Sequence, residues 1–470
     1  MPDSRPRWPG GGTAGPGPST LLLSGVRLSD GRTADVLIDG RRIESVGTAG
    51  SLGTQGTRLD LRGYLLLPAP AEPHAHSDTA LTASPGQAGA HSASPGQAGA
   101  HSASPGQAGA HSASPGQAGA HSASPGQAGA LTADDVRRRA TEAALLQLSH
   151  GATALRAQVR VTTGTGLAPL DAVLEAGRSL RGLMDLTVVA VSGPLTGRAG
   201  ADGLALLRDA VDRGADVVGG RPDLDPDPGG HAEAVLGLAA GHGLPVDLHT
   251  DADDPALLAR YAAMAAAFGP GVSLGPCGGL SRLPEDMAAA AADRLAAAGV
   301  TVVCLPQGGC AGSRLRDTAP AGLLRAAGVR LAAGSGALRD AARPVGRGDP
   351  LEAAYLLAAQ HGLDAAAAYE AVSATARAAM GLPEVRVEAG SPAELLAVRG
   401  DDLPGALSLA YSRIVVHRGR VVARTGAVRE YRAHGDRAPG SGAVRDASAR
   451  GTAGVLGLPR QGRTGPGGEL

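Results

Sequence analysis

The sequence predicts an α/β protein, a (β/α)8 TIM-like barrel with a small composite β-sandwich domain from both chain ends. Three observations support this. After residue 131, short apolar runs of strand length alternate with Ala- and Leu-rich stretches of helix length. The apolar run at 64–67 brings the expected barrel strands to eight. Period-two alternation with Asp-Gly turns marks residues 20–63, and similar alternation returns after residue 385.

The expected barrel elements follow one another as strand, then helix. We place the strands at 64–67, 152–156, 186–191, 215–218, 246–249, 272–274, 300–305 and 329–332. We place helices at 136–148, 203–213, 232–241, 255–268, 284–298 and 319–327, with a further helical block at 350–380. Thr132 is expected to cap the first helix, because a threonine side chain can accept a hydrogen bond from a free N–H of the first turn. In the second part of the β domain we expect strands at 393–398, 407–411 and 414–422.

Composition divides the chain further. We predict a disordered lead at 1–19, the first part of the β domain at 20–63, the barrel at 64–384, the second part of the β domain at 385–428 and a disordered tail at 429–470. Within the barrel, residues 83–130 contain Ser-Pro-Gly-Gln-Ala-Gly-Ala five times with a ten-residue period. Proline and glycine in every copy oppose regular helix or strand, so we predict a flexible insert whose histidines belong only to the repeat.

The overall composition narrows the range of partners. The 470 residues carry a formal net charge of −1, and lysine is absent, so all 43 basic residues are arginines. A chain without excess positive charge is not expected to bind nucleic acid or an anionic membrane. No apolar stretch of about 18 residues is present to span a bilayer. Three cysteines are too few for a disulfide framework, which is typical of a cytoplasmic protein.

A candidate metal site follows the first expected strand. His74 and His76 stand two positions apart, so in an extended backbone their imidazoles point the same way and can bind one ion. His249 ends the fifth expected strand. Because barrel enzymes carry their chemistry at the carboxyl ends of strands, we predict that the three histidines converge as metal ligands. Asp251, two residues later, is the candidate catalytic acid or base, or a further ligand.

These residues resemble the amidohydrolase superfamily, and within it the cytosine deaminase group. A proline-rich segment followed by His-x-His marks that group, and here it reads Pro-Ala-Pro-Ala-Glu-Pro-His-Ala-His over residues 68–76. Further matches occur in order along most of residues 21–425, at 214–220, 246–251, 305–307, 334–340 and 344–352. The resemblance implies the barrel with its composite β domain, one zinc or iron ion, and hydrolytic loss of ammonia from a small cyclic nitrogen-containing substrate. It leaves open whether the chain forms a homo-oligomer.

Three positions depart from the family's pattern. The family uses a glutamate after the strand-five histidine and a strand-six histidine to move protons, and a strand-eight aspartate to bind the metal. The corresponding residues here are Ala252, Pro276 and Gly336. Their side chains can neither transfer a proton nor bind a metal. Since general acid–base catalysis is worth ~10²- to 10⁴-fold, we expect reduced or altered activity.

Two other interpretations stay open. The chain could be a catalytically dead amidohydrolase-fold pseudoenzyme that acts as a binding or interaction module. In a weaker alternative, the histidines of the 83–130 insert form a metal-buffering arm. Metal analysis of the purified protein distinguishes a working histidine site from a vestige of one.

Overall fold

The computed structural model describes residues 20–83, 132–308, 317–341 and 343–427, and the structural statements below concern this part of the chain. These residues belong to one structural unit, which ends at Ala427. The predicted lead and tail, and the decapeptide repeat, lie outside the described residues.

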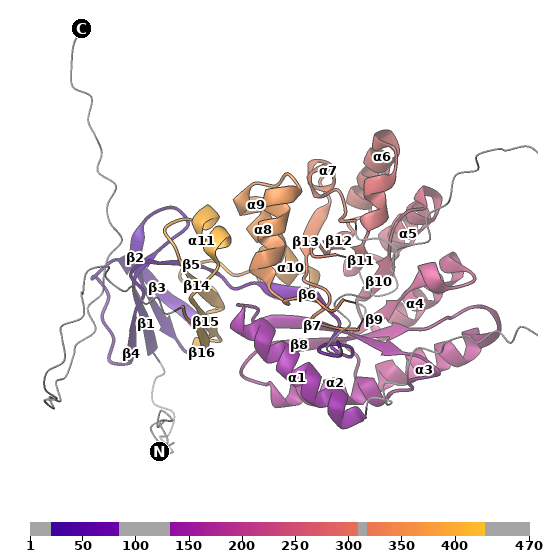
Figure 1. Cartoon of the computed structure of the whole chain (residues 1–470), viewed down its shortest axis with the longest axis horizontal. Helices are drawn as coiled ribbons and strands as arrows, with labels where there is room; N and C mark the ends of the chain where they lie inside the picture. The colour runs from indigo at the N-terminus through magenta and orange to yellow at the C-terminus, as the bar shows by residue number, and fades with distance from the viewer. Residues whose placement is uncertain (1–19, 84–131, 309–316, 342, 428–470) are drawn as a thin grey trace, which may run out of the picture. The chain divides into compact units, whose positions relative to one another are not determined.

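Eight parallel strands form the predicted (β/α)8 barrel (Figure 1). Neighbours in the sheet follow chain order, so each strand connects to the next through a crossover. The first and last strands meet where Ala75 pairs with Gly336 in a parallel bridge. The strands are β6 (Ala71–Ala75), β7 (Ala154–Val161), β8 (Asp185–Ser192), β9 (Val217–Gly220), β10 (Val246–Thr250), β11 (Val272–Pro276), β12 (Thr301–Cys304) and β13 (Arg330–Ala333).

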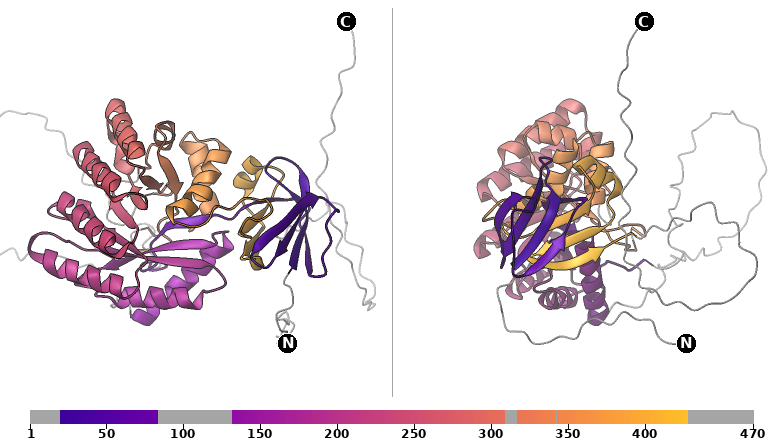
Figure 2. Two further views of the ribbon diagram at one scale, coloured as in Figure 1. Left: turned by 180° about the vertical axis from the view of Figure 1, so that it is seen from behind. Right: turned by 90° about the vertical axis from the view of Figure 1, so that its left-hand side faces the viewer.

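Helices follow the strands and surround the sheet, as the views from the front and from behind show (Figures 1 and 2). Thr132 caps the first of them as predicted, because its side chain accepts the N–H of Asp135. The helices are α1 (Ala133–Ser149), α2 (Ala168–Ser179), α3 (Gly200–Asp212), α4 (Pro228–His242), α5 (Pro255–Phe268), α6 (Glu285–Ala297), α7 (Ala321–Ala326), α8 (Pro350–Gln360), α9 (Ala365–Val372) and α10 (Ala374–Ala379).

The small β domain draws strands from both ends of the described chain, as predicted. Its strands are hydrogen-bonded in the order β16-β15-β14-β5-β1-β2-β3, with β4 paired to β1. The N-terminal and C-terminal parts join where β5 pairs antiparallel with β14. The strands are β1 (Thr20–Arg27), β2 (Thr33–Asp39), β3 (Arg42–Thr48), β4 (Thr57–Asp60), β5 (Tyr64–Pro68), β14 (Leu395–Arg399), β15 (Arg413–His417) and β16 (Arg420–Thr425).

Two strand predictions are wrong. The run at 64–67 is β5 of the small domain, and the first barrel strand is β6. That run is apolar on both faces because Leu65 and Leu67 pack into the barrel core while Leu66 packs into the core of the small domain. Residues 407–411, predicted as a strand, instead contain the end of helix α11 (Leu403–Leu409), whose first turn Asp402 caps.

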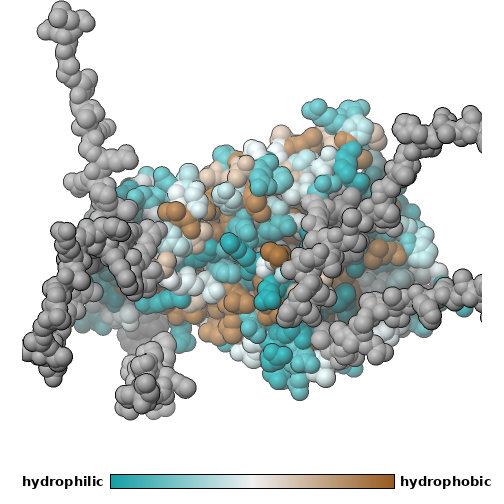
Figure 3. All heavy atoms as spheres, viewed as in Figure 1, coloured by the Kyte–Doolittle hydropathy of each residue, from teal (hydrophilic) through white to brown (hydrophobic). Residues whose placement is uncertain are grey.

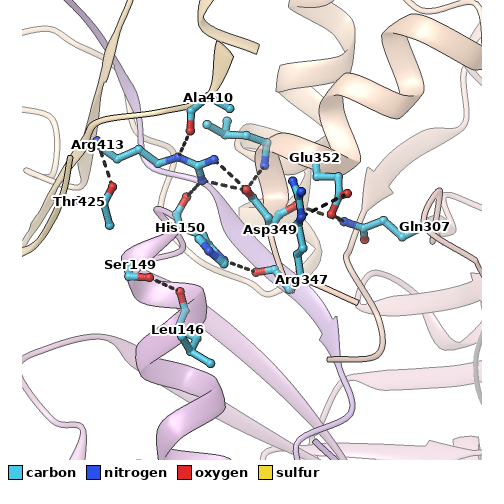
Figure 4. Close-up of polar contacts among 12 residues, drawn as sticks. Leu146, Ser149, His150, Gln307, Arg347, Asp349, Glu352, Ala410, Arg413 and Thr425 are labelled. Atoms are coloured by element: carbon cyan, nitrogen blue, oxygen red, sulfur yellow. Dashed lines mark hydrogen bonds and ion pairs between the residues drawn. The ribbon is translucent and has the colours of Figure 1, made fainter. Parts of the chain in front are cut away.

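A buried ion pair joins β15 to the start of α8 (Figure 4). Arg413 Nη1 and Nη2 lie 2.8 and 2.7 Å from the two carboxylate oxygens of Asp349. Asp349 also caps α8 by accepting the N–H of Leu351, and Arg413 donates to the carbonyl of His150 after α1. Because a bidentate pair fixes the geometry of both partners, this contact holds the small domain against helices of the barrel.

The helices and the surface of the described chain can be examined for apolar stretches. None of its helices is long and apolar enough to cross a bilayer. Hydrophobic residues are interspersed with hydrophilic ones on the face seen in Figure 3. Large apolar side chains that are exposed include Leu224 and Val345.

Candidate metal centre

Three histidines from opposite strands of the barrel meet at the carboxyl ends of these strands. His74 lies in β6, His76 follows that strand, and His249 lies in β10. One nitrogen from each ring can be chosen so that all three lie within 4.8 Å of one another. The ring centroids are 4.5 Å apart for His74 and His249 and 5.1 Å apart for His74 and His76. The structure therefore brings together the three residues that the sequence predicted as ligands.

Strand alternation explains why His249 faces the barrel interior. In β10, Val246 and Leu248 belong to the apolar core that the helices share. Side chains at odd and even positions point to opposite faces, so Asp247 and His249 point inward. Asp247 confirms this direction, since it forms a buried ion pair of 3.2 Å with Arg156 of β7.

Burial keeps the imidazoles neutral. Desolvation, together with the charges of neighbouring histidines, holds the pKa of His74 and His249 well below 6.5. Burial also lowers the pKa of His76, although the charges of Asp78 and Asp340 partly oppose this effect. At neutral pH all three rings are thus in the unprotonated form that binds metals.

Two ring nitrogens in this cluster lack a hydrogen bond within the described residues. They are Nε2 of His76 and Nδ1 of His249, both buried. A buried nitrogen without a partner costs free energy, on the order of 1–3 kcal/mol. A metal ion coordinated by these nitrogens would remove that cost, so the cluster fits the ion that the family resemblance implies.

Glu72 holds the backbone of His74 in place and links the first barrel strand to the segment that follows the last one. Its carboxylate accepts the N–H of His74 at 3.0 Å and the N–H of Ser335 at 2.9 Å, and it also contacts the hydroxyl of Ser335. Ser335 follows β13, so these bonds tie the last strand to the first. Burial raises the pKa of Glu72 to about 7, although its hydrogen bonds act in the opposite direction.

A narrow pocket opens beside the histidines. It is lined by polar side chains from the ends of several strands: His76, Thr79, Gln158, Arg160, Arg221 and His249, together with Val191. Gln158 donates to Asp247, while its Oε1 atom is buried and has no hydrogen-bond partner among the described residues. An acceptor in this position can bind an N–H group of a ligand.

The family follows from a comparison of sequences. A family model described as "Amidohydrolase family" matches residues 117–423, more than half of the chain. The chain belongs to the amidohydrolase family. The resemblance predicted from the strand-end histidines is therefore confirmed.

Individual proteins of known name are similar to this chain. A pterin deaminase of Rhizobium rhizogenes (strain K84 / ATCC BAA-868) is 28% identical over 316 residues, which are 63% of this chain and 71% of the relative. The crystal structure of N-isopropylammelide isopropylaminohydrolase from Burkholderia multivorans ATCC 17616 is 26% identical, with a TM-score of 0.70 over 87% of this chain and 100% of that one. A 5-methylcytosine deaminase from Klebsiella pneumoniae liganded with phosphonocytosine shares the fold, at 20% identity and a TM-score of 0.69 over 88% and 100% of the two chains.

The three departures from the amidohydrolase pattern have clear structural settings. Ala252 is buried in the apolar core, and Pro276 ends β11. Gly336 lies beside the histidine pair, where its N–H donates to the carbonyl of His74 and its carbonyl accepts the N–H of His76. None of the three can offer a metal ligand or a titrating group from its side chain.

Asp251 does not join the histidine cluster. It is half-buried, and its backbone N–H donates to Asp223 at 2.7 Å. Its role as acid or base stays a prediction. Sequence reasoning missed Asp78, which is buried beyond His76 and forms an ion pair of 2.9 Å with Arg160. Asp78 lies in the turn that follows β6, where strand alternation no longer predicts the direction of a side chain, so no clear signal for it was present in the sequence.

Proposed function

We propose that this protein is a metal-dependent amidohydrolase that hydrolyses a carbon–nitrogen bond of a small cyclic nitrogen-containing substrate, with reduced or altered activity. The observation that supports this most is the cluster of three neutral histidines, with two unpartnered buried nitrogens, in an amidohydrolase barrel. Relatives named as pterin deaminase and N-isopropylammelide isopropylaminohydrolase support this substrate class.

The residues of the site divide into ligands and substrate contacts. His74, His76 and His249 would hold one zinc or iron ion, whose Lewis acidity activates water for hydrolysis. Three protein ligands leave a position open, as catalytic sites require. In the adjoining pocket, Gln158 can accept a ring or amino N–H, and Arg160 can donate to a ring oxygen or nitrogen.

Proton transfer has two candidates near the histidines. Asp251 stays the candidate acid or base that follows β10. Asp78 is the second, because its buried Oδ1 has no hydrogen-bond partner in the described residues while Arg160 holds the other oxygen. Either carboxylate would replace the groups lost at Ala252 and Pro276, and this replacement is the reason to expect altered activity.

Ammonia release tests the proposal. The purified full-length chain, reconstituted with zinc or ferrous iron, is assayed against aminated pterins, pyrimidines and triazines. We expect metal-dependent ammonia from at least one class, loss of it in His249→Ala, and no loss in His242→Ala, which removes an exposed histidine of α4. No ammonia from any class in the wild type would contradict the proposal.

A binding module without turnover is the second candidate. It is favoured because Ala252, in the apolar core, and Pro276, at the buried end of β11, carry no group that can transfer a proton. It predicts that calorimetry detects binding of a heterocycle that the chain does not hydrolyse. Adding Ala252→Glu and Pro276→His together then tests whether the lost proton carriers alone explain the inactivity, because restored turnover would show that the pocket still positions substrate.

A further inference from the structure

A second cleft lies at the opposite ends of the barrel strands from the histidines. It is formed where α2 leads into β8 and where the small β domain contributes the turn between β2 and β3 and the turn after β15. Its volume is about 990 Å³. We call it the arginine cleft, because it is lined by Arg41, Arg42, Arg178, Arg181, Arg213, Arg377 and Arg418.

The carboxylates that line the arginine cleft are fewer than its arginines, although Arg213 also pairs with Asp171, which lies outside the lining. Only Asp185, Asp216 and Glu394 line it among the described residues. Asp185 pairs with Arg418, Asp216 accepts the N–H of Val188, and Glu394 binds His417. By contrast, the exposed Arg41, Arg178 and Arg181 form no ion pair within the part of the chain that the structure describes.

Arg377 is the most informative of these residues, because it is only 3% exposed. Its Nε atom donates to the carbonyl of Pro383 at 3.1 Å, and its Nη1 atom donates to the hydroxyl of Thr153 at 3.4 Å. No carboxylate of the described residues lies within ion-pair distance, and burial lowers its pKa. Among the described carboxylates, only Glu394 and Asp185 lie near enough to attract this guanidinium, and both do so from beyond ion-pair distance. A negative ligand in the cleft would therefore find a buried, positively charged group that has no direct ion-pair partner among the described residues.

The lining also defines the partner's chemistry. None of the described residues that line the arginine cleft is aromatic, so these residues offer a base or ring no surface on which to stack. Guanidinium groups match the oxygens of phosphate in bidentate geometry, and several of them spread over one cleft suit an anion with more than one charged group. We propose that the arginine cleft binds a small multivalent phosphate anion, such as an inorganic oligophosphate.

Calorimetry with inorganic triphosphate tests this binding on the full-length protein at 150 mM salt. We expect saturable binding by the wild type and at least about tenfold weaker binding by Arg178→Glu/Arg181→Glu, since reversing two charges removes attraction and adds repulsion. The matched control Arg208→Glu/Arg294→Glu changes the same net charge at exposed positions on α3 and α6. It should bind within about twofold of the wild type.

Three outcomes would overturn the proposal: no triphosphate binding by the wild type, an equal loss in the control variant, or binding to phosphatidylglycerol vesicles without binding of free triphosphate. Circular dichroism of each variant verifies that it is folded. His249→Ala should bind triphosphate as the wild type does, so failure here is distinguishable from failure of the proposed hydrolase activity.

Discussion

The carboxyl ends of β6 and β10 supply side chains to the site, whereas the carboxyl ends of β11 and β13 supply only backbone. The first pair presents His74 and His249, whose side chains face the site. The second pair is followed or ended by Pro276 and Gly336, which contribute backbone only. Yet Gly336 closes the barrel through its bonds to residues 74 and 76, so that closure needs no polar side chain at this position. The barrel thus closes at this point through backbone hydrogen bonds of Gly336, whereas the histidine ends supply side chains to the site.

The largest expected effect is on metal binding, and it concerns the ends of β6 and β10. His249→Ala should reduce bound zinc from about one ion per chain to background, with an affinity loss above the roughly 100-fold that outer-shell changes reach. Metal analysis after dialysis measures this, and His242→Ala, with an exposed histidine on α4, is the matched control. If His249→Ala kept its zinc, His249 would not be a metal ligand, and the carboxyl end of β10 would not supply a side chain to a metal site.

The next effect is on the pH dependence of stability, and it concerns Glu72, which joins β6 to the segment after β13. Its folded pKa of about 7 lies above the ordinary glutamate value of 4.5, so the folded state holds more protons between these pH values. Stability of the metal-free protein should therefore fall as pH rises from about 4.5 to 7, by up to about 3 kcal/mol. Urea unfolding at several pH values measures the slope. Glu72→Gln should flatten it, whereas Glu142→Gln, on the exposed side of α1, should not.

The smallest effect is on the free energy of unfolding, and it concerns Gly336, which follows β13. Gly336 has a φ of +69°, and a Cβ there would lie 3.2 Å from Leu305 Cδ1. Gly336→Ala should destabilise the protein by about 1–2 kcal/mol, because non-glycine residues are strained in this conformation. Gly237→Ala, in the open middle of α4, should stabilise it by up to about 1 kcal/mol. Equal midpoints for both variants in urea would argue against a structural role for Gly336.

Much of the fold could be predicted because the strands and helices of the barrel follow from local hydrophobic patterns. The alternation of short apolar runs with helical stretches predicted seven of the eight barrel strands, which β7 to β13 confirm within a few residues. The failure at 64–67 arose because a strand buried between two cores looks the same whichever sheet it joins. The helix at Leu403–Leu409 was missed because its short apolar run lacks a clear period.

The site was predictable only in part. His74 and His76 follow from spacing, and His249 follows from its place at a strand end. Glu72 could not be given its role, since its partner Ser335 lies 263 residues away in sequence. The arginine cleft likewise gathers residues from Arg41 to Arg418, and only the fold brings them together.

X-ray absorption spectroscopy of the zinc-loaded protein tests the central claim most directly. If His74, His76 and His249 form the metal centre, the spectrum should show three imidazole nitrogens at about 2.0–2.1 Å and one light-atom ligand in the remaining position. His249→Ala should lose one imidazole or fail to load. A first shell with sulfur, or with fewer than two imidazoles in the wild type, would contradict the account.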